Sequence, residues 1–148
     1  MILFSVKTYN ELSKKELYNL LRLRAEVFIV EQDCVYQDID NKDEKALHVL
    51  GYKEGELIAY ARVFKPTDYF EYASIGRVIV SKNERHNKYG YDLMITSIKA
   101  IKTQFNEKNI AISAQEYLQN FYNNLNFIKK GKAYLEDGIS HIYMEKTE

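Results

Sequence analysis

The segment Ile75–Met94, IGRVIVSKNERHNKYGYDLM, constrains the fold of this chain more than any other part of it. Its first residues favour a buried central strand because they are mostly β-branched: Ile75, Val78, Ile79 and Val80. Apolar residues then recur at helical spacing: Met94, Ile98, Ile101 and Phe105. The segment therefore predicts a strand that passes through a short polar loop into an amphipathic helix.

The connecting loop is basic and contains one glycine; its notable residues are Lys82, Arg85, His86, Lys88 and Gly90. The first amides of a helix have no partner within the helix and lie at the positive end of its dipole, so this loop favours a bound phosphate. It matches neither the Walker pattern G-x-x-x-x-G-K-[ST] nor the Rossmann pattern G-x-G-x-x-G. An ordinary strand-turn-helix crossover with solvated charges is the alternative.

The composition favours a single domain, residues 1–148, in a reducing cytoplasm. Because 21 acidic residues balance 21 basic ones, the chain has no net field to recruit nucleic acid or an anionic membrane. The first ten residues, MILFSVKTYN, predict a strand rather than a signal peptide, since Lys7 interrupts the apolar start. No apolar run reaches transmembrane length. The lone Cys34 cannot form an internal disulfide.

The rest of the chain predicts a mixed α/β order. We expect strands over 3–9, 47–53, 57–64, 75–80, 110–114, 127–135 and 139–145, and helices over 13–28, from Gly90 onward and over 116–125. Ser13 and Glu16 form a capping box, and Gly55 and Asp137-Gly138 mark hairpin turns. The acidic, aperiodic stretch 31–44 predicts a loop with at most one helical turn. This order favours a mixed sheet covered by helices on both faces.

Five segments of the chain carry recognisable motifs: LRLRAEVFIVEQDCVYQDID at 21–40, HVLGYKEGELIAYARV at 48–63, the 75–94 segment, AQEYLQNFYNNLNF at 114–127 and EDGISHIYM at 136–144. Together they resemble the GNAT superfamily of acyl-CoA-dependent N-acetyltransferases, and more narrowly its ElaA-like branch. The resemblance implies a twisted, mostly antiparallel mixed sheet of about seven strands, splayed at its centre and covered by helices.

The resemblance also implies a site for acetyl-CoA. The family loop reads Q/R-x-x-G-x-G/A; Arg85 and Gly90 hold its ends, and Lys88 replaces the middle glycine. The strand before the loop would pair with the pantetheine arm and the loop would bind the pyrophosphate. The implied cofactor-binding residues are Val78, Ile79, Val80, Arg85, His86, Asn87, Lys88, Tyr89, Gly90, Tyr91 and Gln115. Solvated charge is the alternative for Lys82 and His86.

Two proton transfers would accompany acetyl transfer to an amine. An alkyl amine is neutral at pH 7 in only about one molecule in a few thousand, a cost of roughly 4 to 5 kcal/mol, so a base should lie nearby. Glu31 is the candidate, with Asp38 and Asp40 as partners for a cationic substrate; a solvated acidic loop is the alternative for all three. The resemblance places Tyr122 at the position whose phenol faces the departing sulfur, with core packing as its alternative.

Three further residues are of types that often take part in catalysis: His48, His141 and Cys34. His48 and His141 lie beside apolar residues in strand patterns, which favours structural roles. Cys34 is not needed as a nucleophile, and the histidines show no metal-ligand spacing.

The chain is therefore expected to acetylate a primary amine of a small molecule or peptide in a ternary complex, using acetyl-CoA and no metal. The alternatives are an inactive CoA-binding or regulatory module and a protein whose phosphate-binding loop binds another nucleotide. The sequence predicts neither the amine nor the oligomeric state.

Overall fold

The computed structural model describes residues 1–147 and is built around one sheet of eight strands. The strands are β1 (Leu3–Thr8), β2 (Leu47–Lys53), β3 (Glu56–Phe64), β4 (Ala73–Val80), β5 (Ile110–Gln115), β6 (Ile128–Lys129), β7 (Tyr134–Glu136) and β8 (Ile139–Lys146). Their order is β1-β2-β3-β4-β5-β8-β6, and β7 also pairs with β8. All pairs are antiparallel except β4 with β5, so the predicted mixed sheet is confirmed.

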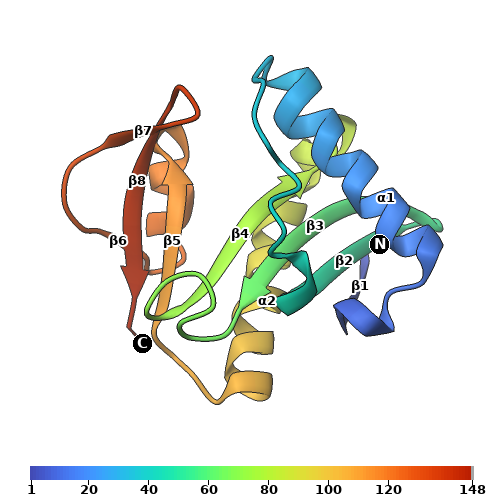
Figure 1. Ribbon diagram of the computed structural model, residues 1–148, viewed down its shortest axis with the longest axis horizontal. Helices are drawn as coiled ribbons and strands as arrows, with labels where there is room; N and C mark the ends of the chain where they lie inside the picture. The colour runs from blue at the N-terminus through green and yellow to red at the C-terminus, as the bar shows by residue number, and fades with distance from the viewer. Residues whose placement is uncertain (148) are drawn as a thin grey trace.

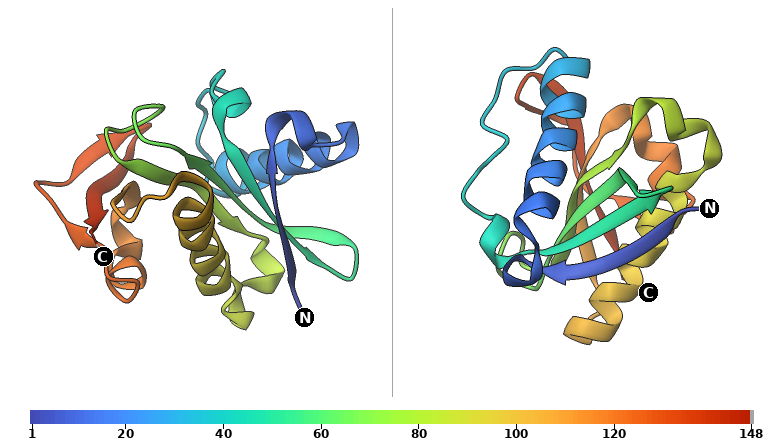
Figure 2. Two further views of the ribbon diagram at one scale, coloured as in Figure 1. Left: turned by 90° about the horizontal axis from the view of Figure 1, so that it is seen from below. Right: turned by 90° about the vertical axis from the view of Figure 1, so that its right-hand side faces the viewer.

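Three helices cover the sheet: α1 (Lys14–Arg24), α2 (Tyr89–Phe105) and α3 (Gln119–Asn123). Helix α1 begins at the predicted Ser13–Glu16 capping box and continues as a π-helical segment, Ala25–Glu31. Helices α1 and α2 lie on opposite faces (Figures 1 and 2). The alternation of β2 and β3 explains this arrangement: Leu50 and Tyr60 pack with α1, whereas their neighbours Val49 and Ala59 pack with α2. Among residues 1–147, no helix is both long and apolar enough to cross a membrane.

The two halves of the sheet separate between β4 and β5. These strands pair only through Ala73 with Ile110 and Ser74 with Ala111, and then diverge (Figure 1). On its other edge β4 stays paired with β3, except at a bulge where Arg77 and Val78 lie opposite Ala61 alone. Arg77 adopts a positive φ of 49° there, which is uncommon for a residue with a side chain. The splayed centre expected from the family resemblance is therefore present.

The predicted strand over 127–135 is two short strands, β6 and β7. Gly131, with a φ of 84°, lies between them in a conformation that does not continue a strand. The hairpin turn at Asp137-Gly138 is confirmed, because both residues have the positive φ that a type I′ turn requires. Asn126 has a positive φ of 69°, a conformation that asparagine adopts more often than most residues with a side chain.

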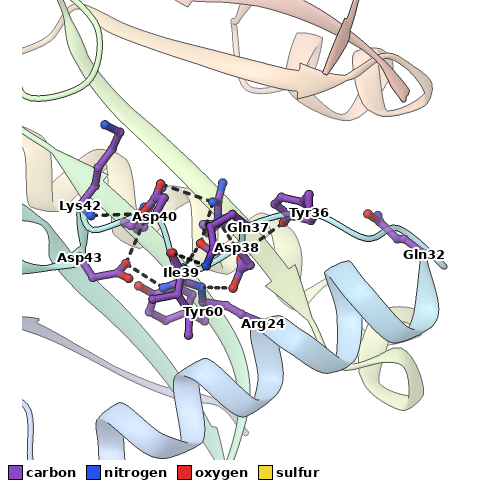
Figure 3. Close-up of polar contacts among 12 residues, drawn as sticks. Arg24, Gln32, Tyr36, Gln37, Asp38, Ile39, Asp40, Lys42, Asp43 and Tyr60 are labelled. Atoms are coloured by element: carbon purple, nitrogen blue, oxygen red, sulfur yellow. Dashed lines mark hydrogen bonds and ion pairs between the residues drawn. The ribbon is translucent and has the colours of Figure 1, made fainter. Parts of the chain in front are cut away.

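Asp38 and Asp43 of the acidic loop are buried and Asp40 is half-buried, so they are not solvated as the alternative interpretation predicted, whereas Glu31, Asp33 and Glu44 are exposed. Arg24, which is fully buried, donates from Nε to Asp38 Oδ2 at 3.0 Å and from Nη1 to Asp43 Oδ1 at 2.7 Å (Figure 3). Arg62 binds both oxygens of Asp40 at 2.8 Å and also reaches Asp43 at 3.0 Å.

A third arginine completes this cluster, because Arg77 Nε lies 2.7 Å from Asp38 Oδ1. The three arginines and three aspartates balance in charge: Arg24, Arg62, Arg77, Asp38, Asp40 and Asp43. Asp38 and Asp40 therefore form structural ion pairs. That they attract a cationic substrate stays a prediction, and these pairs leave them little unpaired charge for it. We call these six residues the arginine-aspartate cluster.

The cluster should make stability depend on acid pH. Burial raises the pKa of the Asp40 carboxyl, but the hydrogen bonds and charge of Arg62 and the charge of Arg77 outweigh burial and lower it to about 2. A folded-state pKa below the unfolded value means that the stabilisation is present above pH 4 and is lost as pH falls toward 2, a contribution of about 2 kcal/mol.

Asp40→Asn should therefore lower the melting temperature at pH 7 and reduce its decline between pH 4 and pH 2, measured by circular dichroism. Glu71→Gln, at an exposed position, is the control and should follow the parent protein. An unchanged pH dependence in Asp40→Asn would contradict this account.

Candidate active site

A cleft of about 700 Å³ lies where β4 and β5 separate. Its walls come from the end of α1, from β4, from the start of α2, from β5 and α3, and from the β7–β8 hairpin. Residues from distant parts of the sequence therefore meet in one cavity, large enough for a small organic ligand.

The β4 wall offers backbone groups to a ligand. Pairing with β5 ends at Ser74, so among the described residues the amides and carbonyls of Ile75–Val80 on that side have no strand partner. Buried backbone polar groups require a hydrogen-bond partner, which an extended ligand could supply. Val78, Ile79 and Val80 all line the cleft, as the cofactor prediction requires.

The loop before α2 has a left-handed backbone at Lys88, the position of the middle glycine in the pattern Q/R-x-x-G-x-G/A. Lys88 stands at the N-cap of α2 with φ 61° and ψ 24°, the left-handed conformation that glycine adopts most readily. A lysine can hold it at a cost of about 1 kcal/mol. No side chain among the described residues caps α2. Tyr91 N donates to Lys88 O at 3.2 Å, so the amides before it are the ones available to an anion.

Gly90 leaves space beside these amides. A Cβ at this position would lie 3.6 Å from Phe121, in ordinary contact, and the φ of Gly90 is not in the left-handed region. The backbone therefore does not require glycine here, and the absence of a side chain serves the cleft that Gly90 lines.

Arg85 and Glu31 form an ion pair at the mouth of the cleft. Arg85 Nη1 and Nη2 contact the two carboxylate oxygens of Glu31 at 2.5 and 2.7 Å, and Arg85 Nε donates to Val80 O at 3.0 Å. Hydrogen bonding from Arg85 lowers the pKa of Glu31. Glu31 is thus near the site, but this pairing makes it a weaker proton acceptor than a free carboxylate.

Tyr122 lies on α3 and lines the cleft although its side chain is largely buried. Burial raises the pKa of its phenol, so the hydroxyl stays protonated at neutral pH. Its ring meets Phe121 and Phe127 edge to face, with centroids 5.0 and 6.1 Å away. These contacts orient the ring, so Tyr122 combines the predicted core packing with a hydroxyl donor in the cleft wall.

Two contacts join the loop after α1 to the far side of the cleft. The side-chain amides of Gln32 and Gln115 exchange hydrogen bonds at 3.2 Å, and Cys34 Sγ lies 3.2 Å from Asp137 O. Gln115 therefore lines the cleft, as predicted, while it bridges its two walls.

The end of the cleft formed by β5, β7 and β8 is polar. Ser113 Oγ lies 3.1 Å from Glu136 Oε1 and 2.5 Å from the Tyr134 hydroxyl. His141 Nδ1 lies 2.7 Å from Ile139 O, and its Nε2 lies 3.6 Å from Glu136 Oε2. We call Ser113, Tyr134, Glu136 and His141 the β-hairpin cluster.

The structure brings most of the predicted site residues together. Those that line the cleft are Glu31, Val78, Ile79, Val80, Arg85, Lys88, Gly90, Tyr91, Gln115 and Tyr122. His86, Asn87 and Tyr89 are not among its lining residues: Asn87 bonds Glu84, and Tyr89 lies under Lys53. His48 is structural as predicted, since its ring nitrogens lie 2.6 Å from the Tyr60 hydroxyl and 2.9 Å from Asp43 O.

Sequence reasoning missed several polar residues of the cleft: Gln32, Tyr36, Arg77, Ser113, Glu136 and Asp137. For His141 a structural role was favoured, yet this residue lines the cleft as well. One signal was available, because the strand pattern puts Glu136 and His141 on either side of a two-residue turn.

The chain is similar to known proteins over almost its whole length. A family model described as acetyltransferase (GNAT) domain matches residues 8–148. ElaA of Escherichia coli K12 is 46% identical over 140 residues, covering 93% of this chain and 92% of ElaA. The crystal structure of Escherichia coli ElaA superposes with a TM-score of 0.92 at 44% identity, covering 99% of each chain.

Two further solved structures place the fold more broadly. An acyl-CoA N-acyltransferase from Pseudomonas aeruginosa has a TM-score of 0.92 at 36% identity, over 99% of this chain and 100% of its own. An aminoglycoside 6'-N-acetyltransferase complexed with coenzyme A has a TM-score of 0.72 at 12% identity, over 97% and 96% of the two chains, and shares the fold alone.

The chain is therefore a member of the GNAT acyltransferase family. Within this family it belongs with ElaA and the related UPF0039 proteins. The residues present fit coenzyme A: the open edge of β4 suits its amide-bearing arm, and the uncapped start of α2 with Arg85 suits its phosphates.

Gly90→Ala should have opposite effects on the stability of the protein and on its affinity for coenzyme A. Alanine in the first turn of α2 should raise the melting temperature by about 2 to 4 °C, since it is less flexible than glycine when unfolded. The added methyl group should weaken binding of coenzyme A about tenfold or more, measured by titration calorimetry.

Thr96→Ala is the matched control, because it lies on the same helix outside the cleft and should leave affinity unchanged. Unchanged affinity in Gly90→Ala would mean that coenzyme A does not approach this turn.

Proposed function

We propose that this protein transfers an acetyl group from acetyl-CoA to a primary amine of a small molecule or peptide, by direct attack in a ternary complex. One observation carries the proposal: a single cleft holds an uncapped helix start, an unpaired strand edge, a largely buried tyrosine and several carboxylates. Both substrates therefore have room in one cavity. The lone thiol, Cys34, supports a reducing compartment such as the cytoplasm.

Acetyl-CoA supplies a thioester whose carbonyl carbon accepts the amine nitrogen while the thiolate departs. Tyr122 would stabilise that leaving sulfur. Burial raises the pKa of this phenol, so full proton transfer to a thiolate, whose conjugate acid ordinarily has a pKa near 8.5, is uphill. Tyr122 therefore acts as a hydrogen-bond donor to the developing negative charge.

The activity is tested by thiol release from acetyl-CoA with three amines: butylamine, spermidine and a tripeptide that contains lysine. We expect thiol release with at least one of them and saturable binding of acetyl-CoA by calorimetry. Tight binding without thiol release for any amine would contradict transfer and would leave a CoA-binding module. No binding would contradict both.

Tyr122→Phe should lower kcat about tenfold to a hundredfold with little change in KM for acetyl-CoA, because it removes one charge-assisted hydrogen bond in a dry site. Steady-state kinetics give both constants. Tyr18→Phe is the control, since Tyr18 is exposed and does not line the cleft. A wild-type kcat in Tyr122→Phe would assign this residue to packing alone.

Glu31 stays a predicted proton acceptor, but its pair with Arg85 suggests a different role. Glu31 holds the guanidinium that a phosphate would need, so Glu31→Gln should free Arg85 and tighten binding of acetyl-CoA about threefold to tenfold. Titration calorimetry measures the affinity, and steady-state kinetics measure kcat. A loss of a hundredfold in kcat would instead support Glu31 as the base.

A further inference from the structure

We propose that Glu136 and His141 form the acceptor site: Glu136 binds the substrate ammonium and His141 Nε2 takes its proton. This inference rests on the proposed function and deepens it, since it names the groups that bind and activate the amine. It also gives a role to the β-hairpin cluster, which the binding of coenzyme A leaves unused.

The β7–β8 hairpin holds the two residues beside each other. Tyr134 is the register partner of His141, Glu136 is that of Ile139, and the Asp137-Gly138 turn closes the pair of strands. On its other edge β8 pairs with β5, where His141 faces Gln115. Both Glu136 and His141 line the cleft, and the paired strands hold their positions relative to a ligand bound there.

The hydrogen bond at Nδ1 decides which nitrogen of His141 can accept a proton. The Ile139 carbonyl lies 2.7 Å from Nδ1 and can only accept, so Nδ1 carries a hydrogen. In the neutral ring Nε2 is therefore the nitrogen with the free lone pair. Tyr134 stacks on the ring with centroids 6.2 Å apart, which helps to hold its orientation.

Glu136 is oriented by a short chain of hydroxyl groups. Ser113 has a single hydrogen, which it donates to Glu136 Oε1 at 3.1 Å, so it accepts the hydrogen of Tyr134 at 2.5 Å. The other oxygen, Oε2, lies 3.6 Å from His141 Nε2. The side chain of Glu136 is 42% exposed, so it remains accessible to a ligand.

The charges around the cleft favour a bound cation at the end formed by β5, β7 and β8. The arginine-aspartate cluster is internally neutral, and Arg85 balances Glu31. Glu136 has no lysine or arginine within ion-pair distance among the described residues, and Asp137 beside it adds a second carboxylate. An ammonium group would therefore be attracted here, at the wall opposite the start of α2.

The substrate ammonium group loses two protons during the reaction, and each has an acceptor. The bound ammonium gives one proton to His141 Nε2, and the imidazolium that results lies beside the Glu136 carboxylate. The neutral nitrogen forms a bond to the acetyl carbon as the carbon-sulfur bond breaks. The nitrogen's second proton leaves with the sulfur as a thiol, and His141 returns its proton to solvent.

The test compares two nucleophiles in two variants. His141→Asn keeps a donor for the Ile139 carbonyl but removes Nε2, and Glu136→Gln removes the charge. Each is assayed by thiol release with the fastest amine of the three above and with hydroxylamine, which is largely neutral at neutral pH. Glu56→Gln, exposed and outside the cleft, is the control and should match the parent protein.

We expect His141→Asn to lower kcat with the alkyl amine about a hundredfold to a thousandfold, but less than about tenfold with hydroxylamine, which needs no base. Glu136→Gln should raise KM for the alkyl amine about tenfold and leave KM for hydroxylamine nearly unchanged. Affinity for acetyl-CoA, measured by calorimetry, should stay constant and would show that each variant is folded.

Equal losses with both nucleophiles, or no loss in either variant, would overturn the inference while leaving acetyl transfer intact. Absence of thiol release in the parent protein would overturn the proposed function and this inference with it. If His141→Asn failed to fold, Glu136→Gln would still test the inference, through the comparison of its KM for the alkyl amine with its KM for hydroxylamine.

Discussion

The early end of pairing between β4 and β5 is the constraint on which the rest of the site depends. Two residue pairs join these strands, and beyond Ser74 the backbone of β4 faces open space rather than a neighbouring strand. Backbone groups left without a partner are costly when buried, so such an edge favours a ligand that supplies hydrogen bonds. The cleft, the exposed edge and the approach to Tyr122 all follow from this divergence.

The arginine-aspartate cluster supports the same region from the other side. Arg77 lies in the β4 bulge with a positive φ, and its ion pairs with Asp38 and Asp40 hold this conformation against the loop. Removing one member would leave buried charge without a partner, which is far more costly than losing a surface pair. Asp38, Asp40 and Asp43 are thus neutralised within the protein, while other residues of the same loop line the cleft.

The GNAT fold could be predicted from the sequence because its signals are local. The strand-loop-helix of 75–94, the Ser13–Glu16 cap and the Asp137-Gly138 turn each depend on residues close in the chain, and each is present. The loop was predicted with Lys88 in place of a glycine, and the backbone there adopts the conformation a glycine would have. His86, Asn87 and Tyr89 were predicted with it, but they are not among the residues that line the cleft, which local pattern cannot reveal.

The sequence by itself determined the family, most of the order of elements and the strand-loop-helix that starts α2, since these depend on hydrophobic period, turn chemistry and short motifs. Only the tertiary structure decided which charges are free. Asp38 and Asp40 look like available carboxylates in the chain, yet arginines 14 to 39 residues away neutralise them. His141 was expected to be structural and Glu136 was not predicted at all, yet both line the cleft. Charge pairing and exposure depend on contacts between distant residues, and folding alone brings these together.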